Sequence, residues 1–138
     1  MTTTPTTRPL RLYLAGPMTG LPDFNRPAFH AAAAALRSAG YEVVNPAELD
    51  ESEPITDPDG TGAWERYMRR DIPHLCKCDA LAMLPGWEQS KGARLERSIA
   101  TALTMAVWPP LTWAMFTKVA AQRTAREAAI EQAKAITA

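Results

Sequence analysis

The chain has 138 residues, 46% of them hydrophobic and 22% charged, with 15 Lys and Arg against 15 Asp and Glu. This length and composition predict one globular domain with a single core, and they exclude disordered, collagen-like and repetitive chains. A net charge of zero argues against binding to polymeric nucleic acid or anionic lipid, which need a surplus of basic residues, so we expect a small-molecule partner.

The first part of the chain has the pattern of a strand, a helix and a second strand. Residues 1–9 contain no apolar stretch of the kind that a signal peptide has, and we expect them to form a disordered tail. Residues 10–15 form a short apolar run before a Gly-Pro pair, which predicts a buried strand. Residues 25–39 repeat alanine and leucine at helical spacing, and residues 41–46 predict a second strand.

The same alternation continues further along the chain. Residues 48–62 are rich in acidic residues and contain prolines, which predicts a solvated loop of unusual length. Residues 63–78 place apolar side chains at helical spacing, although Pro73 is expected to kink this helix or begin a new turn. Residues 79–84 predict a third strand, and residues 90–105 a further helix.

Strands that alternate with helices predict an α/β domain. Right-handed crossovers place the helices on both faces of a parallel sheet, here of about four or five strands. We assign this domain to residues 10–118, with another strand within 111–118, and we expect residues 119–138 to form a helix that packs on the domain or on a partner subunit. An apolar cluster near the end of the domain fits core packing or a dimer interface. Its members are Trp108, Trp113, Met115 and Phe116.

Candidate ligand-binding residues are those that follow the strands. In an open parallel sheet, ligands bind beyond the carboxyl ends of the strands. The residues at these positions are 16–20, Asn45 with Pro46, and 85–92. The glycine-rich segment 16–20 matches neither the dinucleotide-binding fingerprint nor the P-loop, so a tight turn between strand and helix is the simpler interpretation.

The segment after the third predicted strand carries more information. Ser90 and Gly92 lie at the expected N-terminus of a helix, where free backbone N–H groups favour a phosphate or carboxylate. A plain N-cap role for Ser90 is the alternative. Glu96 follows on the same helix face, between the small side chains of Ala93 and Ala100. It is either an exposed surface glutamate or a carboxylate at the ligand-binding edge of the sheet, beyond the carboxyl ends of the strands.

Asp71 is the second candidate carboxylate. It follows Arg70 and precedes Pro73 by two residues, a position that also fits a helix start. Cleavage of a glycosidic bond requires a pair of carboxylates, one to attack the anomeric carbon and one to protonate the leaving group. Asp71 and Glu96 are therefore the candidates for such a pair.

The cysteines, the histidines and the longest uncharged stretch indicate no further site. Cys76 and Cys78 are too close for the long-range disulfides of a secreted protein, so we expect a cytosolic one. With only His74 nearby they lack zinc spacing, and we expect no metal. His30 is expected to be a packed or surface histidine. Residues 98–117 carry no charge, but two prolines interrupt them, and we expect no membrane span.

Four short motifs stand in register along residues 10–105. They are Tyr13-Leu14-Ala15-Gly16-Pro17-Met18-Thr19-Gly20, Arg70-Asp71-Ile72, Cys78-Asp79 and Ser90-x-Gly92-x-x-x-Glu96. In order and spacing they resemble the nucleoside 2-deoxyribosyltransferase family, above all its small phage and bacterial members and its branch of deoxynucleoside 5′-monophosphate N-glycosidases. The resemblance implies a flavodoxin-like fold, a homodimer or higher oligomer in the cytoplasm, including that of a phage host, and cleavage of an N-glycosidic bond with no metal or organic cofactor.

The resemblance also implies a role for each matched residue. Glu96 would attack C1′ of the sugar and form a covalent glycosyl-enzyme. Asp71 would protonate or orient the departing base, and Tyr13 would hold the Glu96 carboxylate in line. Ser90 and Gly92 would hold a 5′-phosphate. The other substrate-binding residues would line the sugar and base pocket: Gly16, Pro17, Met18, Gly20 and Asn45.

We therefore expect an N-glycosidase that acts on a 2′-deoxynucleoside 5′-monophosphate or a deoxynucleoside, by hydrolysis or by base transfer. Ser90 stands where the classical transferases carry Asp, which favours phosphate recognition over exchange between free nucleosides. A non-catalytic nucleotide sensor or sponge that uses the same pocket is the alternative. A phosphoribohydrolase of the lonely-guy type fits less well, because its paired glycines followed by Gly-Thr and Glu are absent.

Overall fold

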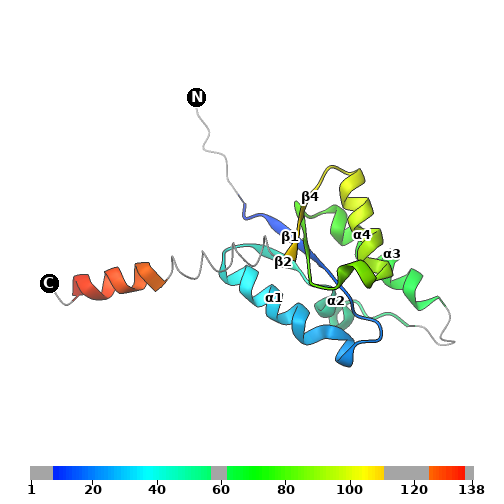
Figure 1. The fold of residues 1–138 in the computed structure, drawn as a ribbon, viewed down its shortest axis with the longest axis horizontal. Coiled ribbons are helices and arrows are strands. Elements are labelled where there is room, and N and C mark those ends of the chain that lie inside the picture. Colours follow the sequence, from blue (N-terminus) through cyan, green and yellow to red (C-terminus); the bar gives the residue numbers. More distant parts are fainter. Residues whose placement is uncertain (1–7, 57–61, 111–124, 136–138) are drawn as a thin grey trace.

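The computed structural model describes residues 8–56, 62–110 and 125–135, and its centre is a parallel sheet (Figure 1). The four strands are β1 (Arg11–Ala15), β2 (Glu42–Val44), β3 (Ala80–Met83) and β4 (Ala106–Trp108). They lie in the order β2-β1-β3-β4, and every neighbouring pair is parallel. This is the strand order of a flavodoxin-like sheet, so the predicted α/β three-layer fold is confirmed.

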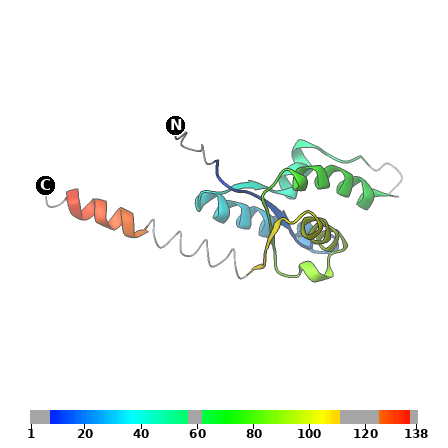
Figure 2. The same ribbon diagram turned by 90° about the horizontal axis from the view of Figure 1, so that it is seen from above.

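Helices cover both faces of the sheet. They are α1 (Arg26–Ser38), α2 (Pro46–Ser52), α3 (Ala63–Cys76) and α4 (Lys91–Ala102), with short 3-10 helices η1 (Pro22–Asn25) and η2 (Trp87–Gln89). Helices α3 and α4 lie side by side (Figures 1 and 2). The layers therefore follow from the right-handed connections that parallel strands require.

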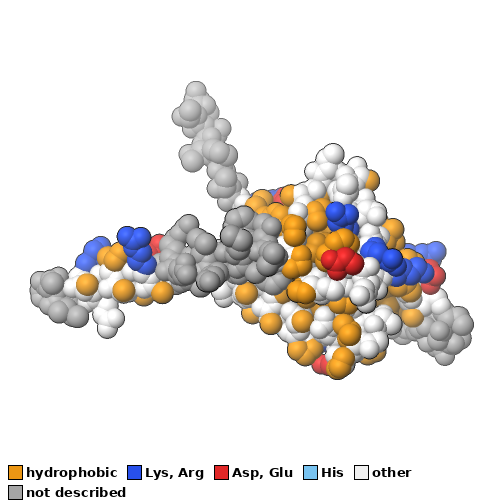
Figure 3. All heavy atoms as spheres, in the orientation of Figure 1, with side chains coloured by type: hydrophobic (Ala, Val, Ile, Leu, Met, Phe, Trp, Pro, Cys, Tyr) orange, Lys and Arg blue, Asp and Glu red, His pale blue; other side chains and the backbone are white. Residues whose placement is uncertain are grey.

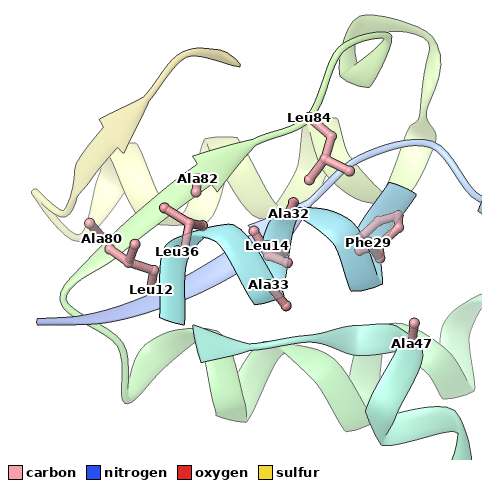
Figure 4. Close-up of a cluster of buried hydrophobic side chains, with 10 residues drawn as sticks. All are labelled: Leu12, Leu14, Phe29, Ala32, Ala33, Leu36, Ala47, Ala80, Ala82 and Leu84. Atoms are coloured by element: carbon pink, nitrogen blue, oxygen red, sulfur yellow. The ribbon is translucent and has the colours of Figure 1, made fainter. Parts of the chain in front are cut away.

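The two faces of β1 build two separate cores. Successive side chains of a strand point to opposite faces, and four of the five β1 residues are buried. Leu12 and Leu14 pack against α1, where Phe29 and Leu36 are buried (Figure 4). Tyr13 and Ala15 belong to the other core, which lies against α3 and α4. Tyr13 thus reaches the layer that holds both candidate carboxylates.

The predicted loop 48–62 is wrong in its first part, where the chain forms α2. The helix begins at Pro46, whose fixed φ suits the first helical turn, and Asn45 caps it by accepting a hydrogen bond from the Ala47 N–H at 3.0 Å. Three acidic side chains of the predicted loop are paired: Glu48 accepts from Arg37 at 2.6 Å, Asp50 lies 3.0 Å from Arg70, and Glu53 lies 2.7 Å from His74. Residues 57–61 lie outside the described residues.

Two other boundaries differ from the prediction. Helix α3 continues through Pro73 to Cys76, because a proline removes only one helical hydrogen bond and the carbonyl that loses its donor belongs to the exposed Arg69. Helix α4 ends at Ala102 and β4 follows almost at once, so a strand comes earlier than the one expected within 111–118. Residues 111–118 lie outside the described residues.

The ends of the domain are held by one aspartate and one aromatic pair. Asp79 accepts from the Arg8 guanidinium at 2.7 and 2.8 Å and from the Arg11 backbone N–H at 2.8 Å, which fixes the chain entering β1. Trp108 meets Tyr41 edge to face at 5.5 Å between ring centroids. The other members of the predicted apolar cluster, residues 113, 115 and 116, lie outside the described residues.

Residues 125–135 are helical, and all of them are exposed. Figure 3 shows both charged and hydrophobic side chains on the surface of this helix. Its packing on the domain or on a partner subunit stays a prediction. Among the helices within 8–56, 62–110 and 125–135, none has the length and apolar character needed to cross a bilayer.

Candidate functional site

A cavity of about 460 Å³ opens beyond the carboxyl end of β1, in the size range of small-molecule sites. Its wall comes from the β1–α1 connection and from all four helices. Five charged residues line it, two basic and three acidic. They are Arg26, Arg70, Asp50, Asp71 and Glu96. Most of the remaining wall is aromatic or aliphatic, with the hydroxyls of Thr19 and Ser90.

Two of the acidic residues are buried. Asp71 on α3 is 7% exposed and Glu96 on α4 is 6% exposed. Both line the cavity, and the packing of α3 against α4 brings them to one site. Carboxylates are rarely buried to this extent unless they are paired or serve a chemical role. The interpretation of Glu96 as an exposed surface glutamate is therefore wrong.

Glu96 is buried because α4 turns its small residues toward the sheet. Ala93 and Ala100 are fully buried on the same helix face, so Glu96 between them is carried inward. Burial raises the pKa of Glu96 to about 8, with a smaller contribution from the charge of Asp71, while Tyr13 opposes the shift. Glu96 therefore holds its proton at neutral pH.

Tyr13 is the polar group behind Glu96. Its ring is fully buried in the α3–α4 core, and its hydroxyl completes no hydrogen bond with any described residue. Burial, then the negative charges of Glu96 and Asp71, raise the pKa of Tyr13 well above its usual value, so the phenol stays protonated. A phenol O–H beside a buried carboxyl group is placed to stabilise that group once it ionises.

Asp71 has a different environment because a guanidinium is bound to it. Arg70 Nε donates to Asp71 Oδ1 at 2.7 Å, and Arg70 Nη2 lies 3.0 Å from Asp50 Oδ1 on α2. Burial raises the pKa of Asp71, and Arg70 partly opposes that rise. Asp71 lies inside α3, so the helix-start interpretation is wrong: the proline that suggested it is tolerated within the helix.

The N-terminus of α4 forms another part of the wall. Ser90 caps the helix, with its Oγ accepting from the Ala93 N–H at 3.1 Å, which confirms the N-cap interpretation. Ser90 and Gly92 also line the cavity. A Cβ at Gly92 would lie 3.3 Å from Met68 Sδ and 3.6 Å from Trp64 Nε1, so glycine keeps this corner open. The first turn of α4 thus borders the cavity, and a helix N-terminus is a position that favours an anion; binding of a phosphate there stays a prediction.

Three aromatic side chains of the wall were not identified as site residues from the sequence. Phe24, Trp64 and Tyr67 line the cavity, and each has a cation over one ring face, at 3.9 to 5.1 Å from the ring centroid. Trp64 and Tyr67 were predicted only as members of an apolar helix face. The indole N–H of Trp64 is buried and has no partner among the described residues. Aromatic walls of this kind suit a planar ligand.

Several predicted binding residues do not line the cavity. Pro17 offers its carbonyl to Asn25 Nδ2 at 2.9 Å. Gly20 sits in an exposed turn with φ +82°. Asn45 is buried, caps α2 and lies 3.3 Å from His30 Nδ1. Among the predicted binding residues, the cavity brings together Gly16, Met18, Ser90 and Gly92.

Gly16 gives the first testable prediction. A Cβ at this position would lie 2.7 Å from Leu84 Cβ, closer than van der Waals contact allows. The Leu84 N–H is bonded to the Ala15 carbonyl at 2.8 Å, so the two strand ends cannot separate freely. Gly16→Ala is therefore expected to lower the free energy of unfolding by about 1–3 kcal/mol, measured by urea denaturation. A change no larger than that of Ser98→Ala on the exposed face of α4 would contradict this packing.

The described residues show no arrangement that would hold a metal ion. Within 8–56, 62–110 and 125–135, no group of three His, Cys, Asp or Glu side chains is placed so that it could hold a metal ion. Cys76 is exposed, Cys78 is buried, and both are free thiols. His30 lies at the surface, one of the two positions expected for it.

A comparison with family models places the chain. The model described as "Domain of unknown function (DUF4406)" matches residues 10–108. The chain belongs to this family. The match begins one residue before β1 and ends at the last residue of β4, so the DUF4406 domain contains the whole sheet and the cavity. A comparison with curated proteins finds no match.

Proposed function

We propose that this DUF4406 domain is an N-glycosidase that cleaves the bond between base and sugar in a 2′-deoxynucleoside 5′-monophosphate or a deoxynucleoside. One observation carries the proposal: two buried carboxyl groups in different environments, Glu96 and Asp71, line one cavity that is wide enough for a nucleotide. The resemblance to the nucleoside 2-deoxyribosyltransferase family supports it through the same residues.

The first half of the proposed reaction forms a bond to Glu96. The ionised Glu96 carboxylate attacks C1′ of the sugar, a C1′–O bond forms, and the C1′–N bond to the base breaks. Asp71 gives its proton to the departing base nitrogen. Tyr13 donates a hydrogen bond to the Glu96 carboxylate and favours its charged form, which agrees with the lowering effect of Tyr13 on the pKa of Glu96.

The second half releases the sugar. The Asp71 carboxylate takes a proton from water, or from the nitrogen of a second base, and the resulting nucleophile attacks C1′. The ester to Glu96 breaks, and the sugar leaves with net retention of configuration. Water gives hydrolysis and a second base gives transfer, with the same glycosyl-enzyme in both.

One proton shared by two carboxyl groups controls the resting state. Burial, which raises the pKa of Glu96 to about 8, favours that proton on Glu96, whereas attack requires it on Asp71. Because both forms carry one proton, their ratio does not change with pH between the two pKa values. Base release should therefore follow a bell-shaped pH profile, with an alkaline limb set by loss of the shared proton.

Other parts of the wall fit the rest of a nucleotide. The aromatic side chains Phe24, Trp64 and Tyr67 are suited to contact with a base, and the first turn of α4 at Ser90 and Gly92 is suited to a 5′-phosphate. A phosphate there would also lie in the field of Lys91, whose ammonium is 3.9 Å from the centroid of the Trp64 ring.

The direct test is release of free base. Purified protein is incubated with each deoxynucleoside and each 5′-monophosphate, with the ribonucleotides as matched substrates, and free base is followed by chromatography. We expect faster release from the deoxynucleoside 5′-monophosphates. A labelled second base in the mixture separates transfer from hydrolysis. Saturable nucleotide binding in calorimetry, with no base released on long incubation, would instead indicate a nucleotide sensor.

Tyr13→Phe separates activity from stability. The change removes a buried hydroxyl that has no partner among the described residues, so the free energy of unfolding should stay the same or rise. Base release should slow by about 10- to 100-fold, because ionised Glu96 loses the donor that stabilises it. Equal losses of activity and stability would show that Tyr13 acts only in packing.

A further inference from the structure

The guanidinium of Arg70 lies between two carboxylates from different helices. Its Nε is 2.7 Å from Asp71 Oδ1 and its Nη2 is 3.0 Å from Asp50 Oδ1. The side chains of Arg70, Asp71 and Asp50 are 6%, 9% and 14% exposed, so water screens these charges only weakly. Asp50 comes from α2, the helix that the sequence analysis missed.

The guanidinium is also held in place from its other sides. Nη1 of Arg70 donates to the Glu53 carbonyl at 3.3 Å, and its Cζ lies 5.0 Å from the centroid of the Tyr67 ring. Arg70 therefore has little freedom to move toward one carboxylate when the other loses its charge. Asp50 receives a second, weaker contact from Arg26 Nε at 3.5 Å, on a side chain that is 35% exposed.

Every packed element contributes a group that faces Asp71. Arg70 and His74 share helix α3 with it, and Asp50 approaches from α2. Glu96 and Tyr13 face it from α4 and β1. His74 is paired with Glu53 at 2.7 Å, and Arg26 on α1 contacts Asp50 at 3.5 Å. Arg70 is thus the near cation, and Asp50 is the anion that shares it.

We propose that Asp50 and Arg70 form a positioning pair that sets which of the two cavity carboxyl groups carries the shared proton. A guanidinium bound to Asp71 alone would keep it ionised and unable to protonate a leaving base. The negative charge of Asp50 offsets part of the effect of Arg70 on the pKa of Asp71. Asp71 can therefore hold a proton while its hydrogen bond with Arg70 still fixes its orientation. The catalytic role of this pair rests on the proposed function, but its effect on the pKa of Asp71 can be measured without any substrate.

Two substitutions should shift the pKa of Asp71 in opposite directions. Asp50→Asn keeps the shape and the acceptor oxygen of the side chain and removes its charge, so Asp71 is left with the full field of Arg70 and its pKa should fall by about 1 unit. Arg70→Gln removes the cation, and the pKa of Asp71 should rise. A merely structural role would not produce shifts of opposite sign.

The measurement needs no substrate. The side-chain carboxyl ¹³C resonance of Asp71, assigned by its loss in Asp71→Asn, is titrated by NMR in the intact chain and in each variant. The Glu96 resonance is followed in the same titration, because burial raises the pKa of Glu96 to about 8. Glu48→Gln is the matched control: Glu48 also lies on α2 in an ion pair with an arginine, but it does not line the cavity. It should leave the Asp71 titration unchanged.

The outcomes separate this inference from the proposed function. A fall in the Asp71 pKa with Asp50→Asn supports the pair even if no nucleotide is cleaved. An unchanged or higher Asp71 pKa in that variant overturns it, whatever the activity. If the Arg70→Gln variant folds, its Asp71 pKa should rise, opposite to the fall in Asp50→Asn. If it does not fold, the result for Asp50→Asn alone decides the inference. If base is released, Asp50→Asn should also lower kcat about 10-fold, because less Asp71 carries the proton.

Discussion

Replacing Glu96 with alanine is expected to lower the rate of base release by at least about a thousandfold, which corresponds to about 4 kcal/mol of activation free energy. The carboxylate would form the bond to C1′, and Asp71 cannot replace it because Arg70 holds the Asp71 carboxyl on α3. The domain should stay folded, since Glu96 has no ion pair among the described residues and its removal leaves no charge unpartnered.

Glu88→Ala is the matched control for this result. Glu88 is an exposed glutamate on η2, close in sequence to the start of α4 and absent from the cavity wall. Its replacement should leave the rate unchanged. Mass spectrometry of the acid-quenched wild-type reaction should show the mass of the sugar on Glu96. A Glu96→Ala protein with normal turnover would end the assignment of Glu96 as nucleophile.

The second large effect is on stability as a function of pH. The pKa of Glu96 is about 8 in the folded chain, against an ordinary value of 4.5 that applies when the chain is unfolded. Between these values the folded state binds a proton that the unfolded state has released. This contribution to stability is therefore complete below pH 4.5 and is lost as pH rises toward 8, with a slope of at most about 1.4 kcal/mol per pH unit.

Glu96→Gln tests this prediction. Glutamine keeps the shape of the protonated side chain and cannot ionise, so its free energy of unfolding should lack this fall. Urea denaturation at pH 5 and pH 8 should show that the free energy of unfolding of the variant increases relative to that of the wild type as pH rises. All ionisable groups other than residue 96 are common to both proteins, so their contributions cancel in the difference, and Glu88→Gln should run parallel to the wild type. Parallel behaviour of Glu96→Gln would mean that Glu96 is ionised in the folded chain.

Local patterns predicted most of the fold. The apolar run of β1, the alanine spacing of α1 and the Ser90 cap of α4 each lie within a short segment, and all three were placed within one or two residues. Helix α2 was missed because it has only seven residues and several acidic ones, although Asn45 before Pro46 is a cap followed by a proline in the first turn. β4 has only three residues at a sheet edge, and its position depends on pairing with β3.

Part of the cavity lining could be predicted from the sequence. Glu96 and Asp71 follow from the requirement for two carboxylates and from matched motifs, and both line the cavity with Gly16, Met18, Ser90 and Gly92. Asp50 and the aromatic wall could not be predicted in this way. They come from separate elements that are brought together only when α2 and α3 pack around the β1–α1 connection. Contacts of this kind leave no spacing pattern in the sequence.

Asn45 has a consequence for any genetic screen of this domain. Its side chain caps α2, the helix that delivers Asp50 to the cavity, while Asn45 itself stays out of the wall. Variants at Asn45 that lack a capping oxygen are expected to loosen the start of α2 and so the position of Asp50 beside Arg70, and they would lose function as a ligand contact does. A map of inactivating substitutions would thus enclose a larger area than the cavity wall, and its outer ring would mark the residues that support the two buried carboxyl groups.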